Sequence, residues 1–224
     1  MFNKLEIDVT QHNELVDAVN LAVRYNIPAL VINQSLISEA FLLRIARQGR
    51  FKIISPVDWS KGDNYGLLKL RGMTFSALSS DGFEILLTPN KSPEETEKEA
   101  SALIECFKHT VSKICEVRFV LHILHNETPS LLMYNTLLNI RRPSMVRTDI
   151  KTKTPMGKHG VLAHNEIIRK LKNMGNLPIK VSGNFTSWRS IVECTAADKI
   201  AVSLTQLETI IKEYNKWINE NREP

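Results

Sequence analysis

The chain has 224 residues, of which 43% are hydrophobic and 24% are charged, and its formal net charge is +5. This length suits one domain with a sizeable core, so we expect a single domain over residues 1–224 with a frayed tail at 219–224. No stretch approaches the roughly 20 apolar residues that span a bilayer, and no signal peptide is apparent. We therefore expect a cytoplasmic protein without membrane association.

The positive charge permits an anionic small-molecule ligand, but the basic residues are dispersed along the chain. Because no basic motif interleaved with aromatic residues is present, we do not expect nucleic-acid binding. The three cysteines, Cys106, Cys115 and Cys194, are odd in number and lack metal-ligand spacing. They are interpreted as buried free thiols, and neither a metal nor a cofactor is expected.

In the first half of the chain, short apolar runs alternate with helical patterns. Strands are expected at 4–8, 28–33, 51–55 and 83–88, and helices at 14–23, 38–46, 67–77 and 92–111. Ser38 is a plausible N-cap for the second helix. Ser92, followed by proline and two glutamates, is typical of a helix start.

The second half repeats this alternation. Strands are expected at 117–124, 144–148, 178–182 and 199–203, and helices at 129–140, 163–174, 188–194 and 204–218. Eight strand–helix units in a chain of this length predict an α/β fold, the (β/α)8 TIM barrel. An open doubly wound sheet is the competing arrangement. It is disfavoured because no glycine-rich phosphate-binding turn follows the first strand.

In such a barrel the functional residues lie at the carboxyl ends of the strands. The candidates there are Asp8, Asn33, Arg118, His122, Arg147, Thr148, Lys180, Ser182 and Ser203. Asp8 can instead cap a helix or pair with a barrel arginine, and His122 can be a satisfied interior histidine. Arg147 and Lys180 are harder to explain structurally, because a cation inside a barrel is costly without a partner.

Several of these positions resemble deoxyribose-phosphate aldolase, in order along nearly the whole chain. The matching segments are Ile7-Asp8-Val9-Thr10, Val31-Ile32-Asn33, Trp59-Ser60-Lys61-Gly62, Val146-Arg147-Thr148 and Ile179-Lys180-Val181-Ser182-Gly183. The resemblance implies class I aldol cleavage. It implies a Schiff-base lysine on strand six, a lysine on strand seven that lowers its pKa, and a proton-shuttling aspartate on strand four.

This sequence departs from that pattern in three places. Arg147 occupies the Schiff-base position, and a guanidinium stays protonated and cannot form the imine. Strand four reads Glu84-Ile85-Leu86, so the aspartate is missing unless Glu84 replaces it. The family's glycine-rich phosphate turns are reduced to Gly183, because Leu204 follows Ser203 after strand eight.

Two main hypotheses follow. The first is a divergent barrel that has lost aldolase activity and serves in binding or assembly, as a homo-oligomer or with an anionic ligand, and shows an exposed apolar patch on its helical shell. The alternative is an active class I aldolase or lyase on a small phosphorylated or carboxylated sugar, with Lys180 as Schiff-base lysine. His122 and Asp8 would then be catalytic as well. Another kind of barrel enzyme is the third reading.

In both main hypotheses the ligand would be bound at the barrel mouth. The predicted binding residues are Arg147, Arg118, Asn33, Thr148, Ser182, Gly183 and Ser203.

Overall fold

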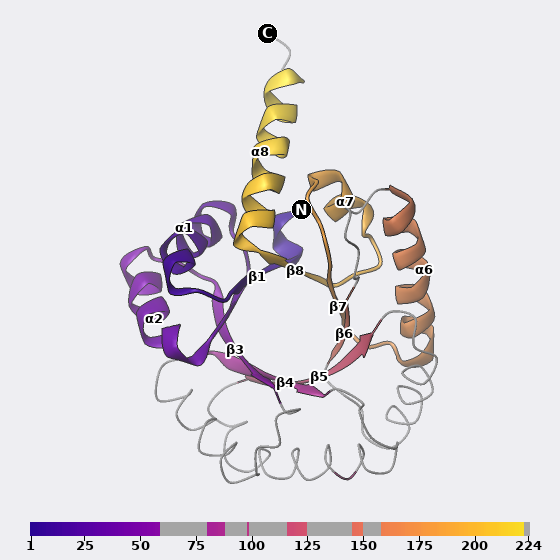
Figure 1. Cartoon of the computed structure of the whole chain (residues 1–224), viewed down its shortest axis with the longest axis horizontal. Coiled ribbons are helices and arrows are strands. Elements are labelled where there is room, and N and C mark those ends of the chain that lie inside the picture. Colours follow the sequence, from indigo (N-terminus) through magenta and orange to yellow (C-terminus); the bar gives the residue numbers. More distant parts are fainter. Residues whose placement is uncertain (59–79, 88–97, 99–115, 125–144, 150–157, 222–224) are drawn as a thin grey trace.

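The computed structural model describes residues 1–58, 80–87, 98, 116–124, 145–149 and 158–221. The strands within these residues form one closed barrel, in which each strand is parallel to both neighbours (Figure 1). They are β1 (Leu5–Val9), β2 (Ala29–Ile32), β3 (Lys52–Asp58), β4 (Gly82–Leu87), β5 (Glu116–Leu124), β6 (Met145–Asp149), β7 (Ile179–Ser182) and β8 (Lys199–Ser203). The closed order β1 to β8 confirms the predicted (β/α)8 barrel.

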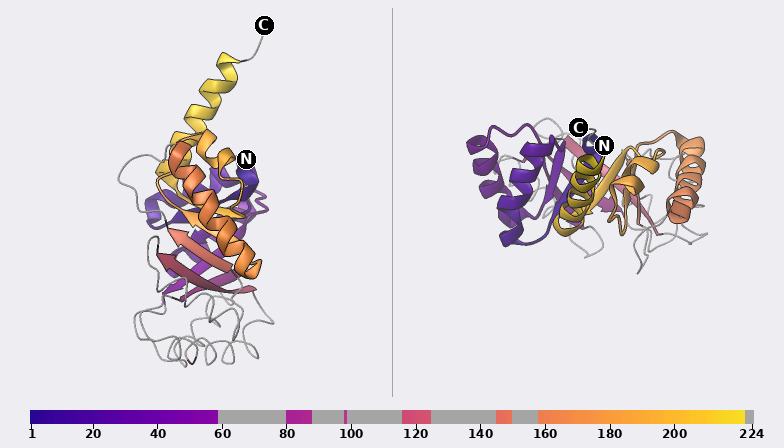
Figure 2. Two further views of the ribbon diagram at one scale, coloured as in Figure 1. Left: turned by 90° about the vertical axis from the view of Figure 1, so that its right-hand side faces the viewer. Right: turned by 90° about the horizontal axis from the view of Figure 1, so that it is seen from above.

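The described helices lie outside the barrel along part of its circumference (Figure 1). They are α1 (Leu15–Tyr25), α2 (Ile37–Ala46), α6 (Lys158–Gly175), α7 (Trp188–Glu193) and α8 (Leu204–Glu220), with short 3-10 turns η1 (Phe2–Lys4), η2 (His12–Glu14) and η3 (Gln34–Leu36). The helices predicted at 67–77, 92–111 and 129–140 lie outside the described residues, apart from residue 98. The later part of α8 extends away from the barrel (Figures 1 and 2). None of the described helices is long and apolar enough to cross a membrane.

The core has two parts. The larger cluster lies between strands and helices, and it includes Ile7 and Ile179 from the strands and Val19 and Leu207 from the helices. The smaller cluster, Ala29, Val31 and Ile54, comes from strands alone and lies inside the barrel. All four residues of β2 are buried, as expected for a parallel strand covered on both faces.

Several helix ends differ from the sequence-based expectation, and three of them are informative. Helix α2 begins at Ile37, so Ser38 is not its N-cap; the side chain of Asn33 caps the preceding η3 turn by accepting from the Ser35 N–H. Helix α6 begins at residue 158 instead of 163, and Val161 in its first turns is fully buried. Helix α8 continues past the predicted end at 218 to Glu220, which forms an i,i+4 ion pair with Lys216 at 3.7 Å.

Candidate functional site

Strand alternation and register determine which side chains face the inside of the barrel. Strand β1 pairs Glu6 with Ala29 and Asp8 with Val31, and these two partners belong to the interior cluster. Register partners in a parallel sheet share a face, so Glu6 and Asp8 also point inward. Lys180 lies in β7, which is separated from β1 by β8 alone, and it is one of the largest fully buried side chains.

Lys180 forms a buried ion-pair cluster with two glutamates from other strands. Its Nζ lies 2.6 Å from Oε2 of Glu6 and 3.2 Å from each carboxylate oxygen of Glu84. The side chains of Lys180 and Glu6 are 0% exposed, and that of Glu84 is 5% exposed. Removing a charge from water costs several kcal/mol. The cluster is tolerated because the opposite charges lie close enough to offset this cost. We call these three residues the buried ionic cluster.

The cluster fixes the protonation state of the lysine. Burial by itself lowers the pKa of Lys180, but the carboxylates of Glu84, Glu6 and Asp8 outweigh it, and the net pKa is raised. Lys180 is therefore an ammonium ion at neutral pH. An ammonium cannot attack a carbonyl, because Schiff-base formation requires the free amine.

We call the carboxyl ends of the strands the barrel mouth. A second group of polar side chains lies nearer to this mouth than the buried ionic cluster does. Nη2 of Arg147 lies 3.7 Å from Oδ2 of Asp8 and donates to Oγ of Ser182 at 3.4 Å. The side chains of Arg147 and Asp8 are 21% and 29% exposed, so both remain accessible. The sequence-based candidates Asp8, Arg147 and Ser182 are thus brought together.

The carboxylate of Asp8 is incompletely satisfied. Burial raises the pKa of Asp8, although the nearby charges of Lys180 and Arg147 act in the opposite direction. Its Oδ1 atom is buried and accepts no hydrogen bond from the described residues. A buried acceptor without a donor is costly, so Oδ1 is a natural partner for a ligand hydroxyl or amine.

Thr148 does not join this group. It is 3% exposed and pairs in register with Val181, which packs in the cluster between strands and helices. Thr148 therefore faces the opposite side of β6 from Arg147, because successive side chains of a strand alternate. The alternation of side chains along β6 places Thr148 in the layer between the strands and the helices, away from the barrel mouth.

Three further candidates, at or just beyond the ends of strands, have local structural roles. Asn33 caps η3, and Ser203 caps α8 by accepting from the Gln206 N–H at 3.3 Å. The carbonyl of Gly183 accepts from Nε2 of Gln206 at 2.7 Å, which ties the turn after β7 to the start of α8. Their predicted roles in ligand binding stay predictions.

Arg118 and His122 both lie in β5. Arg118 is in register with Glu84, and His122 is in register with Arg147. The side chains of Arg118 and His122 lie outside the described part of the structure, and so does the Trp59–Gly62 segment. Their proposed roles stay predictions.

The sequence-based reasoning did not single out Glu6. A usable signal was present, because Glu6 lies between Leu5 and Ile7 in β1 and has the same strand phase as Asp8. An acidic residue in such an apolar strand needs a buried cation. Glu84 was considered only as a replacement for a catalytic acid, and the structure places its carboxylate against Lys180.

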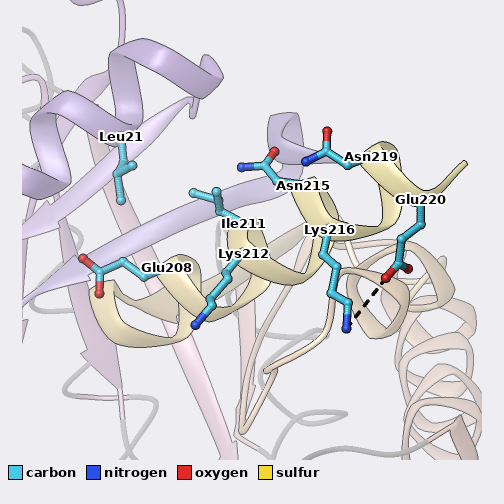
Figure 3. Close-up of a pocket in the computed structure, with 8 residues that line it drawn as sticks. All are labelled: Leu21, Glu208, Ile211, Lys212, Asn215, Lys216, Asn219 and Glu220. Atoms are coloured by element: carbon cyan, nitrogen blue, oxygen red, sulfur yellow. Dashed lines mark ion pairs between the residues drawn. The ribbon is translucent and has the colours of Figure 1, made fainter. Parts of the chain in front are cut away.

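A groove of about 600 Å³ lies along α8, away from the barrel mouth. Figure 3 shows it between Leu21 of α1 and a row of α8 side chains that includes the Lys216–Glu220 ion pair. None of the predicted site residues lines it. Within the described residues, no three His, Cys, Asp or Glu side chains gather in an arrangement that could hold a metal ion.

Comparisons with solved structures find barrels of the same kind over nearly the whole chain. An aldolase called QR15 superposes with a TM-score of 0.72 at 13% identity, covering 99% of this chain and 98% of that one. A tetrameric deoxyribose-phosphate aldolase from Aeropyrum pernix gives a TM-score of 0.70 at 15% identity, covering 96% and 91%.

A third neighbour has a different activity in its name. A monomeric dihydrodipicolinate synthase variant gives a TM-score of 0.58 at 7% identity, covering 98% of this chain and 76% of that one. No family model and no curated protein sequence matches the chain. At these identities the likeness is one of fold, and one fold hosts many chemistries. The chain thus shares the (β/α)8 barrel architecture of these aldolases.

Proposed function

We propose that this chain is a divergent aldolase-like barrel that binds a small anionic ligand at the barrel mouth and does not perform Schiff-base chemistry. The observation that carries the proposal is the state of Lys180. Its ammonium is fully buried between Glu6 and Glu84, and its raised pKa keeps it protonated. Arg147, at the position where the resemblance places the Schiff-base lysine, cannot form an imine either.

The barrel mouth supports binding of an anion. Arg147 supplies a fixed positive charge that is partly exposed, and its guanidinium geometry suits a carboxylate or a phosphate. Oδ1 of Asp8 is an acceptor that lacks a donor among the described residues. The ligand therefore combines an anionic group, bound by Arg147, with a hydroxyl or amine that donates to Asp8.

The capping of α8 supports the proposal that backbone N–H groups at its start do not bind a phosphate. Ser203 accepts from the Gln206 N–H, and the Gln206 side chain accepts in return from the Ser203 N–H at 2.9 Å. This reciprocal capping box occupies two of the amide donors that a phosphate would otherwise use at a helix start. Anion binding consequently depends on the side chain of Arg147.

The same proposal treats residues 1–224 as one domain of a cytoplasmic protein. Cys194 is buried as a free thiol, and burial raises its pKa to about 11. A thiol of this kind is unreactive and suits a compartment in which cysteines stay reduced.

The catalytic part of the proposal is tested by trapping. The protein is incubated with acetaldehyde or 2-deoxyribose-5-phosphate, reduced with borohydride and mapped by mass spectrometry. We expect no adduct on Lys180 and no cleavage of the sugar phosphate. An adduct on Lys180 that disappears in Lys180→Ala would establish the aldolase alternative.

The binding part uses inorganic phosphate and malonate as probes in calorimetric titration. We expect Arg147→Met to weaken binding about tenfold or more, because one charge-assisted contact is lost. The matched control is Arg169→Met, which removes an exposed arginine of α6. Equal binding by wild type and Arg147→Met would reject the barrel mouth as the anion site.

A further inference from the structure

The outward side of α2 is apolar and exposed. Leu42 and Ile45 are 65% and 58% exposed, the two highest values among the large hydrophobic side chains described as exposed. Ser38 and Ala46 are also exposed and share this side at helical spacing. We define Ser38, Leu42, Ile45 and Ala46 as the α2 outer face.

The opposite side of α2 is already used for packing. Ile37 and Ala40 are fully buried against the barrel. A helix that is apolar on both sides is usually covered on both sides, and exposed apolar patches of this kind mark interfaces. Figure 1 shows α2 at the outer rim of the molecule, where another chain can reach it.

We propose that the α2 outer face binds the same face of a second copy of this chain, with the two helices antiparallel across a two-fold axis. The sizes of the side chains along the α2 outer face support this pairing. An antiparallel copy centred near Leu42 packs the two Leu42 side chains together and places Ser38 opposite Ala46 at each end. Small residues at both ends allow the two helices to approach closely, as a self-complementary interface requires.

The distribution of charge supports the same orientation. Glu39, in the first turn of α2, has a side chain that is 41% exposed. Arg47 and Arg50, at and beyond the last turn, are exposed. An antiparallel copy brings the acidic end of each helix to the basic end of the other, whereas a parallel copy would oppose like charges.

The expected interface is modest in size. A ten-residue helix is about 15 Å long, so α2 alone buries less area than a standard stable interface. Val16 of α1, which is 43% exposed, can extend it, because the neighbouring η2 turn is joined to α2 by the His12–Glu39 ion pair at 2.8 Å. We therefore expect a reversible dimer with a dissociation constant on the order of micromolar.

Sedimentation of the full chain over roughly 1 to 300 micromolar tests the interface. Leu42→Asp is expected to raise the dimer dissociation constant about 100-fold, because each dimer contains the buried charge twice. The matched control is Leu162→Asp, which changes a leucine of α6 that is 50% exposed and should leave association unchanged. A wild-type chain that stays monomeric throughout, or equal effects of both variants, would overturn the proposal.

A charge exchange tests the antiparallel orientation. Glu39→Arg and Arg47→Glu should each weaken the dimer about fivefold, whereas the combined variant restores opposite charges and should recover most of the wild-type affinity. Thermal unfolding of each variant verifies that the monomer remains folded. The two single substitutions, if independent, would multiply their effects on the dimer dissociation constant. If the combined variant shows this multiplied effect, the antiparallel pairing is rejected.

Discussion

At the scale of single residues, Lys180 places a buried positive charge against the carboxylates of Glu6 and Glu84. We predict that Lys180→Met lowers the free energy of unfolding by about 3–5 kcal/mol at pH 7, because the two buried carboxylates then lose the ammonium that lies against both of them. Urea unfolding followed by circular dichroism measures this loss.

The control for this prediction is Lys172→Met. Lys172 forms an ion pair with Asp198 at 2.8 Å, but the two side chains are 30% and 41% exposed. Solvent screening limits such a pair to less than about 1 kcal/mol. A loss in Lys180→Met as small as that in Lys172→Met would mean that the buried ionic cluster is not formed in solution.

Asp8 is predicted to reduce stability at neutral pH. Because its pKa is raised in the folded state, folding favours the protonated form, and stability falls as pH rises from the ordinary aspartate pKa of 3.8 through the raised value. Asp8→Asn should therefore raise the free energy of unfolding at pH 7, by about 0.5–2 kcal/mol. The gain should shrink as the pH approaches 4.

The comparison variant is Asp17→Asn on the exposed face of α1, which should change stability little at either pH. Unfolding curves at pH 7 and pH 4 give the measurement. If Asp8→Asn destabilises the protein at pH 7, the carboxylate contributes favourably to the fold. The interpretation of the Asp8 carboxylate as an unsatisfied group that binds a ligand would then be wrong.

At the scale of elements, the strands were predictable because apolar runs mark them; all four residues of β2 and the three central residues of β8 are buried. Each predicted strand overlaps an observed one, and the 199–203 strand coincides with β8. The predicted helix starts at 188 and 204 coincide with those of α7 and α8, whereas α6 begins five residues before the predicted 163, since a helix start also depends on contacts beyond the helix. Ser38 had the residue type of an N-cap, but Asn33 starts a 3-10 turn that leads directly into α2.

The candidate site was predictable only in part. Strand phase alone places Asp8, Arg147 and Lys180 inside a barrel, and the same reasoning excludes Thr148 once the phase is known. It does not reveal which interior side chains meet, because Glu6, Glu84 and Lys180 come from three separate strands. Their pairing depends on how the closed barrel brings β1, β4 and β7 around one centre.

At the scale of the whole molecule, closure of the barrel joins the two ends of the chain. Strand β1 pairs with β8, and the first part of α8 packs on both (Figure 1). The buried residues of α8 are Leu204, Leu207, Ile210 and Ile211. At roughly 1.5–3 kcal/mol for each side chain, α8 contributes about 6–12 kcal/mol. This is as large as the whole stability of a typical domain, about 5–15 kcal/mol.

We therefore predict that a chain ending at Ser203 does not fold cooperatively. A chain ending at Ile218 removes only residues 219–224, of which Asn219 and Glu220 are exposed, and should lose less than about 1 kcal/mol. Urea unfolding measured by circular dichroism distinguishes the two. A cooperative transition in the shorter chain would show that the barrel closes without α8, and that the α8 contacts with β1 and β8 are not needed to hold the two ends together.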